Sequence, residues 1–531
     1  MKTNQHEYGH QSGGKIKSEP FHFDLVARYF QKKDNSGAFH IVSDKTCNDL
    51  DFNELFQFLD RTTSRVGQQY LFDKIRAIHH NPVDIETDEV VIDTLMSNPA
   101  TLAEIQKTLD KLGNSEAYYL NSLFQEAHLK PPSWLPFARI LSFISVVSVL
   151  SLFFSPIAIF ILIPVVIINL VIHYRNKNNL YYYTDSLPQL IKLKEVASTL
   201  SGHDILNGMA GNLADSIRMI DKLKKRMILI RLEAGMQGDL TSVFWGLVEL
   251  VKIVFLIEPI MLFDVLRRLE NKKNHIGNIF RFVGHVDALA SIALLRKSLR
   301  RYCTPVITTQ SQELLAKEVY HPLIPGCVDN TLSVSSRSVL LTGSNMSGKT
   351  TFIRTIGINL LIGLALNTCF AKEFRMPRCR VFSAIRITDD LLNSKSYYFE
   401  EVLTIKGMIA ESRSGDPCLF LLDEIFKGTN TIERISAGKA VLSYLSGDNN
   451  LVFVSTHDIE LAELLKSQFD LYHFSEMVDK QTVAFDYKLK NGKLKNRNAI
   501  KILEINGYPP EIIDEAITLA RVFDNSGASK L

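Results

Sequence analysis

The spacing of apolar and polar residues divides this 531-residue chain into helical, strand-forming and continuously apolar stretches. From Leu180 to Arg301, apolar residues recur at the helical period, with few Gly or Pro to interrupt them. From Phe21 to Pro131 the pattern is mixed and predicts shorter helices. Toward the C-terminal end, short apolar runs typical of buried strands alternate with helical patterns, which predicts an α/β domain. The helices expected upstream of that domain are Asp51–Asp60, Gly67–Ile78, Leu187–Leu200, Ala214–Glu233, Ser242–Glu270 and Gly284–Tyr302.

One apolar stretch, Ile140–Tyr174, contains no Asp, Glu, Lys or Arg. As a single helix it would be about 50 Å long, whereas the hydrocarbon core of a bilayer is about 30 Å thick. Ser155-Pro156 interrupts it, so we expect two short membrane spans, 140–154 and 157–174, folded as a hairpin. Arg139 and Arg175 at its two ends place both ends, and with them both chain termini, on the cytoplasmic side of the cytoplasmic membrane. The alternative is a very apolar helical hairpin buried inside a soluble protein.

A second apolar stretch, Val243–Phe263, is interrupted by three charged residues, Glu249, Lys252 and Glu258. These charges occur at helical spacing, which favours a buried or amphipathic helix over a membrane span.

The octapeptide Gly343–Thr350 reads Gly-Ser-Asn-Met-Ser-Gly-Lys-Thr and fits the pattern of a phosphate-binding loop. Ser338–Thr342 before it is typical of a buried strand, and Thr351–Leu366 after it of a helix, whose N-terminus attracts an anion. The glycines let backbone N–H groups turn toward a phosphate, and the lysine can reach the β- and γ-phosphates of ATP. The alternative is a Gly-containing turn without a ligand. The predicted ATP-binding residues are Gly343, Ser344, Asn345, Met346, Ser347, Gly348, Lys349, Thr350 and Thr351.

Two further strand ends carry the remaining chemistry. The apolar run that begins at Cys418 ends at Asp423, which can hold Mg²⁺ through water together with the Thr350 hydroxyl. Glu424 follows directly and is placed to orient or deprotonate the attacking water. A second strand, Asn450–Thr456, ends at His457, which could sense the γ-phosphate or position the water. The predicted catalytic residues are therefore Lys349, Glu424 and His457, and the predicted metal ligands are Thr350 and Asp423.

Composition excludes some classes and indicates no partner. Hydrophobic residues make up 46% of the chain and charged residues 22%, as in an ordinary globular protein, and the net charge is only +3. The six cysteines are scattered, so neither a zinc site nor a disulfide framework is indicated, which suits a reducing cytosol. Basic clusters at Lys222–Arg226 and Arg267–Lys273 could meet DNA phosphates or anionic lipid heads, or simply form solvated helix faces.

The motifs resemble those of the MutS family of mismatch-repair ATPases. Thr342–Thr351 is similar to the family's Thr-Gly-Pro-Asn-Met-Gly-Gly-Lys-Ser-Thr, and Asp423–Thr429 to its Asp-Glu-Leu-Gly-Arg-Gly-Thr. Asp389–Val402 resembles the family's signature segment, with Ser396 at its serine, and Ser455–His457 resembles its histidine segment. The resemblance implies an ABC-like P-loop ATPase domain of the MutS type that binds ATP and Mg²⁺. It also implies a homodimer with composite sites, in which Ser396 reaches the γ-phosphate bound by the other subunit.

The chain departs from the family pattern in four motif positions and in length. The residues at these positions are Ser344, Ser347, Phe426 and Lys427, where the family usually has Pro, Gly, Gly and Arg. None of these changes removes a phosphate or Mg²⁺ ligand, so ATP binding is still expected, but they put in doubt the family's usual coupling between ATP and DNA. The core-like motif starts near residue 50, which leaves no room before it for a mismatch-reading domain.

These observations predict a membrane-anchored MutS-like ATPase that couples ATP hydrolysis to DNA binding, either mismatch-repair-like or related to DNA structure. The alternative is a membrane-tethered ATP-binding scaffold without mismatch recognition. An ABC transporter or SMC-like ATPase is disfavoured because the interval between the P-loop and the acidic strand contains no Leu-Ser-Gly-Gly signature. The predicted division is a disordered tail at 1–20, a MutS core-like helical region at 21–130, a transmembrane hairpin region at 131–178, a helical core and lever region at 179–310, the ATPase domain at 311–523 and a disordered tail at 524–531.

Overall fold

A computed structural model describes residue 17 and residues 21–79, 85–184, 186–209, 211–221, 242–344, 346–386, 397–478, 483–494 and 499–527. The chain divides into two compact units. The helical unit comprises Met1–Gly37, Leu59–Lys74 and Asn81–Ser298, and the sheet unit comprises Ala38–Phe58, Ile75–His80 and Leu299–Leu531. The ATPase domain predicted at 311–523 therefore lies within the sheet unit, which also takes in two short segments from the N-terminal part of the chain and residues 299–310.

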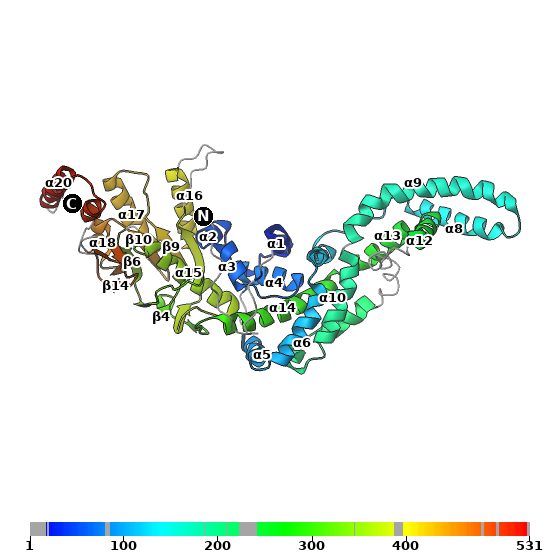
Figure 1. Ribbon diagram of the computed structural model, residues 1–531, viewed down its shortest axis with the longest axis horizontal. Helices are drawn as coiled ribbons and strands as arrows, with labels where there is room; N and C mark the ends of the chain where they lie inside the picture. The colour runs from blue at the N-terminus through cyan, green and yellow to red at the C-terminus, as the bar shows by residue number, and fades with distance from the viewer. Residues whose placement is uncertain are drawn as a thin grey trace. The chain divides into compact units, whose positions relative to one another are not determined.

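The sheet unit is a mixed α/β structure (Figure 1). Its strands are β1 Ala38–Ile41, β2 Ala77–His79, β3 Val306–Thr308, β4 Glu313–Val319, β5 Asn330–Ser335, β6 Ser338–Thr342, β7 Glu373–Pro377, β8 Arg380–Ala384, β9 Cys418–Asp423, β10 Leu451–Thr456, β11 Phe469–His473, β12 Glu476–Val478, β13 Val483–Phe485 and β14 Lys490–Asn491. Its helices are α2 Asp44–Asp49, α3 Phe52–Leu59, α15 Lys349–Leu366, α16 Tyr397–Glu411, α17 Thr431–Leu445, α18 Ile459–Leu465, α19 Ala499–Ile505 and α20 Pro510–Gly527.

Within the described residues, the main sheet has six strands in the order β14-β11-β6-β10-β9-β8. Strands β11, β6, β10, β9 and β8 are parallel, and only the edge strand β14 runs antiparallel to its neighbour. The carboxyl ends of β6, β10 and β9 therefore meet at one edge of the sheet, where ligands bind in open α/β sheets. A second sheet, in the described part of this unit, has the order β3-β7-β4-β5.

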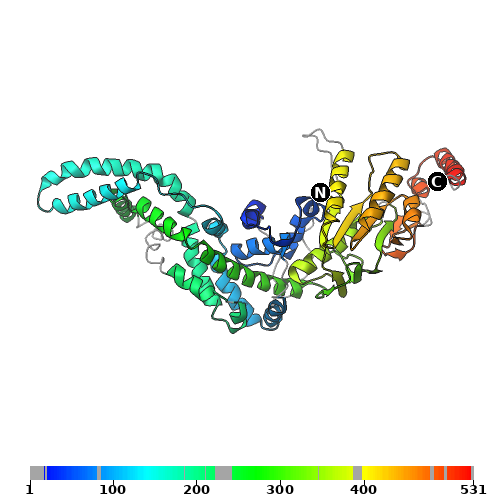
Figure 2. The same ribbon diagram turned by 180° about the vertical axis from the view of Figure 1, so that it is seen from behind.

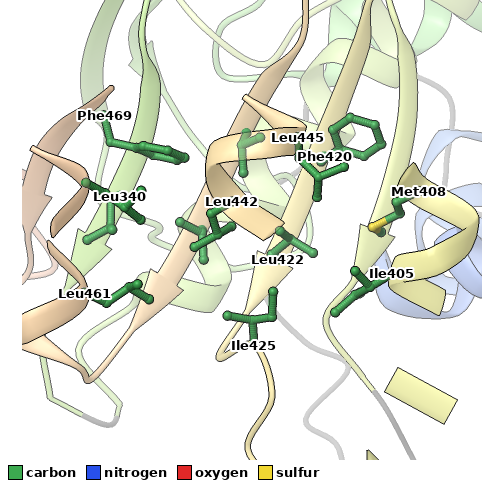
Figure 3. Close-up of a cluster of buried hydrophobic side chains, with 14 of the residues drawn as sticks. Leu340, Ile405, Met408, Phe420, Leu422, Ile425, Leu442, Leu445, Leu461 and Phe469 are labelled. Carbon is green, nitrogen blue, oxygen red and sulfur yellow. The ribbon is translucent and has the colours of Figure 1, made fainter. Parts of the chain in front are cut away.

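Helices cover both faces of the main sheet. On one face, apolar side chains of the strands pack against α16, α17 and α18 in a buried cluster (Figure 3). Burying each such Leu, Ile or Phe contributes about 1.5–3 kcal/mol. Helix α15 contacts the sheet at β9 and β10, where a Cβ on Gly357 would lie 2.4 Å from Leu421 Cδ1, so a larger residue there would force the Leu421 side chain to shift. The residues that Figure 3 labels in the buried cluster beneath α16, α17 and α18 are Leu340, Ile405, Met408, Phe420, Leu422, Ile425, Leu442, Leu445, Leu461 and Phe469.

The N-terminal segment of the sheet unit fixes the end of strand β8. The buried Asp49, at the end of α2, accepts hydrogen bonds from Ser383 Oγ at 2.7 Å and from the backbone N–H groups of Ile385 and Arg386, both at 2.9 Å. These bonds lie shortly before the segment that resembles the family's signature, whose residues 389–396 lie outside the described part of the chain.

The helical unit is built from long helices and short 3₁₀ turns (Figure 2). Its α-helices are α1 Phe23–Lys32, α4 Arg65–Arg76, α5 Ile85–Ser97, α6 Pro99–Leu109, α7 Ser122–Gln125, α8 Leu135–Ser151, α9 Ile159–Thr184, α10 Ser186–Leu200, α12 Ser242–Val254, α13 Ile257–Glu270 and α14 Lys273–Ser298. Its 3₁₀ helices are η1 Asp110–Leu112, η2 Ser115–Asn121, η3 Pro156–Ala158 and η4 Asp204–Met209.

Most predicted helices are present, with shifted ends. The helix expected over Gly67–Ile78 ends earlier, because Ala77–His79 forms strand β2. The helix expected over Gly284–Tyr302 is α14, which begins eleven residues earlier. Of the helix expected over Ala214–Glu233, the described part is helical over residues 213–221. The prediction of one helix over Ser242–Glu270 is wrong: the chain breaks after Val254, and Leu256 takes the left-handed conformation with φ 48°.

The apolar hairpin has its break at Ser155-Pro156, between α8 and η3. Large apolar side chains project outward along it, and those of Phe153 and Phe154 at its tip are 83% and 93% exposed. Within the described ranges, three helical stretches are long and apolar enough to cross a membrane: Pro156–Asn176, α14 and α15. Only 17% of the apolar window of the first is buried, against 83% and 78% for the other two, which are therefore core helices of their own units.

Candidate nucleotide-binding site

The glycine loop joins the fully buried strand β6 to helix α15. Gly348 has φ 106°, a conformation that favours glycine, and it immediately precedes the helix. Lys349 Nζ donates hydrogen bonds to the carbonyl oxygens of Gly343 at 2.8 Å and Ser344 at 2.9 Å. Burial lowers the pKa of Lys349, while Glu424 and Asp423 oppose that shift. The ammonium thus lies inside the loop, at the place where a phosphate is expected.

Both serines that depart from the family pattern donate side-chain hydrogen bonds. Ser344 Oγ donates to the buried carboxylate of Glu476, on strand β12. Ser347 Oγ donates to the Ser344 carbonyl oxygen at 2.8 Å. The loop shape is therefore held by side-chain hydrogen bonds. Met346 is exposed with φ 66°, and Asn345 lies outside the described residues.

Asp423 lies at the end of β9, with the end of β10 between it and the loop strand. Thr350 Oγ1 donates to Asp423 Oδ2 at 2.7 Å, and Ser455 Oγ donates to Asp423 Oδ1. A hydroxyl and a carboxylate oxygen beside a phosphate loop suit Mg²⁺, which binds proteins through few oxygens and keeps several waters. The neighbouring Thr351, on the first turn of α15, is half-buried and its carbonyl accepts a hydrogen bond from Thr355 Oγ1 at 2.7 Å.

Glu424 lies between a histidine and a lysine. Its Oε1 lies 2.8 Å from His457 Nε2 and its Oε2 lies 2.6 Å from Lys427 Nζ. Lys349 Nζ lies 3.4 Å from the same His457 nitrogen. Burial would raise the pKa of Glu424, but its hydrogen bonds to His457 and Lys427 outweigh burial and lower the pKa to about 2. The carboxylate is therefore ionised at neutral pH, as a general base must be.

The three predicted catalytic residues, Lys349, Glu424 and His457, thus lie together at the carboxyl ends of three strands. The fourth element of the prediction, Ser396 from the other subunit, lies outside the described residues.

We expect the substitution Lys427→Met to move the acid limb of the ATPase pH profile to higher pH. The variant lacks one of the groups that lower the pKa of Glu424, so this pKa rises and the carboxylate is protonated earlier as the pH falls. The measurement is kcat against pH over the acid range in which the protein stays folded. Lys466→Met, at the end of α18, is the matched control. Acid limbs that superimpose for Lys427→Met and wild type would contradict the expectation.

Phe426 occupies a position where the family usually has Gly, and it has φ 61°. Its backbone N–H donates to Glu401 Oε1, on α16, and burial raises the pKa of that glutamate. The ring is buried and contacts Tyr398, with ring centroids 6.2 Å apart. The strained backbone after Glu424 is therefore held by α16 on both the main chain and the side chain.

We expect Phe426→Gly to destabilise the protein although it relieves strain. Relief of the left-handed conformation gains about 1–2 kcal/mol, whereas removal of a buried Phe side chain costs about 3–5 kcal/mol. The net loss of roughly 2 kcal/mol is measured by denaturant unfolding. Asp448→Gly is the control, because Asp448 has φ 53° but is exposed, so its replacement should not destabilise. An unchanged or raised stability of Phe426→Gly would refute the account.

Sequence reasoning missed several residues at this site. Glu476 and Glu401 support the loop and the backbone after Glu424 through contacts between distant elements. Tyr487 lies beside the loop as well: a Cβ on Gly348 would be 3.3 Å from its ring, which stacks with Phe485.

Four features define a P-loop NTPase domain of the ABC-like kind. They are a buried parallel strand, the glycine loop that follows it, the N-terminus of the next helix, and an acidic strand end that one strand separates from the loop strand. Residues 339–524 match the family model described as MutS domain V. The chain is 28% identical over 316 residues to the DNA mismatch repair protein MutS of Petrotoga mobilis, which covers 57% of this chain and 38% of that relative. It is 29% identical over 283 residues to the protein of the same description in Bacillus velezensis, covering 50% of this chain and 32% of the relative.

The ATPase region of this chain is therefore similar to domain V of the MutS family, and the resemblance predicted from its motifs is confirmed. The chain spans about a third of the length of the curated relatives it matches.

Proposed function

We propose that this protein binds ATP with Mg²⁺ and hydrolyses it at the P-loop site. The observation that carries the proposal is the arrangement around Glu424, an ionised carboxylate beside His457 at the mouth of a lysine-containing glycine loop. In this proposal Lys349 and the loop N–H groups bind the phosphates of ATP. Tyr487 offers an aromatic face next to the loop on which the adenine ring can stack. Glu424 accepts a proton from the attacking water, which His457 helps to position.

Thr350 and Asp423 would hold the Mg²⁺, whose charge supports phosphoryl transfer when it is bound. Asp423 also has a structural role, because it accepts hydroxyl hydrogen bonds from Thr350 in the first turn of α15 and from Ser455 near the end of β10.

We further propose that two copies pair through their ATPase domains and that Ser396 of each completes the site of the other. The support is the family match of residues 339–524 together with the position of α16, which begins at Tyr397 directly after this serine. A helix N-terminus favours an anion such as a γ-phosphate.

DNA is the partner proposed for this motor, since the relatives are described as DNA mismatch repair proteins. Of the two basic clusters, Lys222–Arg226 lies outside the described residues. In the other, Arg268 lies 3.0 Å from Asp264 and Lys273 2.6 Å from Glu270, so intrahelical and neighbouring carboxylates already engage part of it. The test is binding of the purified protein to plain, mismatched and branched DNA, with and without ATP, at increasing salt. Binding through phosphates weakens steeply with salt; no binding at low salt would favour the ATP-binding scaffold.

The third part of the proposal is that the α8–α9 hairpin inserts into the cytoplasmic membrane, with the ATPase on the cytoplasmic side. It is supported by the outward-facing apolar side chains along both helices and at the tip. Water contact with this much contiguous apolar surface is unfavourable for a monomeric soluble protein.

We expect the triple substitution Phe153→Asp, Phe154→Asp and Phe160→Asp to release the protein from membranes. Each Asp in the hydrocarbon region costs about 2.5–3.5 kcal/mol, and all three side chains are exposed, so the fold itself should tolerate the change. The measurement is flotation with liposomes. A matched triple substitution of exposed apolar residues of the sheet unit, Ile432→Asp, Tyr444→Asp and Leu464→Asp, should leave flotation unchanged. Undiminished flotation of the hairpin variant would rule out insertion by this hairpin.

A further inference from the structure

The charged residues of the second apolar stretch face the interior of a helix cluster. Lys252, on α12, is almost fully buried, and its Nζ lies 2.9 Å from Glu258 Oε1 and 3.5 Å from Glu249 Oε2. The buried His173, on α9, has Nε2 at 3.3 Å from Glu249 Oε1 and Nδ1 at 3.6 Å from Glu258 Oε2. The spacing of these charges in the sequence counts against membrane contact, but paired charges that face a bundle interior are tolerated in membranes.

The break between α12 and α13 is packed into the hairpin. Leu256, at the break, is fully buried and forms one apolar cluster with Ala138 and Leu141 of α8 and Val165 of α9. The hairpin helices α8 and α9 also contact α13, and α9 contacts α12. The four helices therefore share one core, and the corner that the chain makes between α12 and α13 packs against the hairpin.

The backbone carbonyl groups at this corner receive hydrogen bonds from polar side chains of the hairpin. Asn169 Nδ2 donates to Val254 O at 2.7 Å, and Ser142 Oγ donates to Phe255 O at 2.7 Å. The last carbonyl groups of a helix have no partners within it, and hydrocarbon offers none, so a helix break at membrane depth requires donors of this kind. Asn169 is itself fully buried and its amide also donates to Ser145 Oγ at 3.2 Å.

The outer side of the corner is apolar. The side chains of Leu250 and Val251, one turn before the break, are 57% and 45% exposed. The charged residues on either side of them, Glu249 and Lys252, are paired with each other. The corner contacts the hairpin at Asn169, which precedes Arg175 by six residues, or about 9 Å along the helix. The corner would therefore reach about a third of the way into a hydrocarbon core of about 30 Å.

We propose that α12 and α13 form a re-entrant corner that enters the same bilayer leaflet as the base of the hairpin. Lipid chains contact Leu250 and Val251, while Lys252, Glu249, Glu258 and His173 remain paired between the helices. The membrane-embedded part of the protein is then a four-helix unit, and α14, which continues from α13, leads directly out of it. This inference rests on the proposed insertion of the hairpin.

Depth-dependent fluorescence quenching tests the corner and the hairpin separately. An environment-sensitive dye is attached to Leu250→Cys or to Phe154→Cys, in a full-length chain carrying Cys303→Ser and Cys327→Ser, the two native cysteines that are not fully buried. The proteins are reconstituted in vesicles that contain lipids with a quencher either near the headgroup or deep in the acyl chain. We expect the deep quencher to act more strongly at residue 154 and the shallow quencher to act more strongly at residue 250.

The outcomes distinguish the two proposals. Lipid quenching at residue 154 without lipid quenching at residue 250, where aqueous iodide would act instead, overturns the corner and leaves the hairpin intact. No lipid quenching at either site overturns both. As a second variant, Asn169→Leu removes the donor to the Val254 carbonyl group and should lower the lipid quenching at residue 250 by several-fold, with quenching at residue 154 retained. Ile168→Leu, an exposed position on the same helix, is the matched control and should change neither.

Discussion

Replacing Glu424 by Gln is expected to reduce the ATP turnover number by about 10²- to 10⁴-fold, the contribution of a positioned general base. Binding of ATP should be nearly unchanged, because the groups proposed to bind the phosphates are Lys349 and the loop N–H groups, and the hydrogen bonds that hold Lys349 in the loop do not involve this carboxylate. Gln keeps the shape of the side chain and can still accept a hydrogen bond, but it cannot take a proton at neutral pH.

Two measurements separate chemistry from binding: the steady-state rate of phosphate release and the dissociation constant of a fluorescent ATP analogue. Glu460→Gln, an exposed position on α18 of the same unit, is the matched control and should behave as wild type. Wild-type turnover by the Glu424→Gln protein would remove Glu424 from the mechanism and reopen the assignment of the base.

Mixing two inactive variants is expected to restore activity if the site is shared between subunits. Lys349→Ala loses the phosphate-binding lysine and Ser396→Ala loses the residue proposed to act in the other subunit. A heterodimer of the two has one site with both defects and one intact site. Random exchange of equal amounts should therefore recover about a quarter of the wild-type rate, since about half of the dimers are heterodimers.

The complementation result also tests the pairing itself. Each variant mixed with itself should stay inactive. A mixture of Lys349→Ala with Glu424→Gln should also recover no activity, because one subunit supplies both Lys349 and Glu424 to a given site, so neither site of the heterodimer is intact. Absence of recovery in the first mixture, with subunit exchange verified by labelled chains, would place Ser396 outside the functional site.

Local sequence patterns predicted much of the fold. The strand, loop and helix around Gly343 and the acidic strand end at Asp423 were predicted within a few residues, because short continuous apolar runs and glycine spacing are local features of the sequence. The hairpin break at Pro156 followed equally from a local rule, the tendency of proline to begin or interrupt a helix. The lysine at position 427, by contrast, stood out only as a departure from the family pattern.

Long-range contacts decided the rest. The sequence placed Glu424 and His457 at two strand ends, but only the strand order, with β10 beside β9, brings them within 2.8 Å of each other. The single helix predicted over Ser242–Glu270 failed because the break at Leu256 depends on donors from the hairpin, Ser142 and Asn169, more than eighty residues away in the chain.

The sequence by itself therefore determined that this chain carries a MutS-type phosphate loop, an acidic strand end and a long uncharged hairpin, since each follows from neighbouring residues. Only the tertiary structure decided that Lys427 and His457 hold Glu424 ionised, and that the charges of α12 are paired inward against His173. The physical reason is that charge pairing and burial depend on which distant elements pack together, and one-dimensional periodicity does not contain that information.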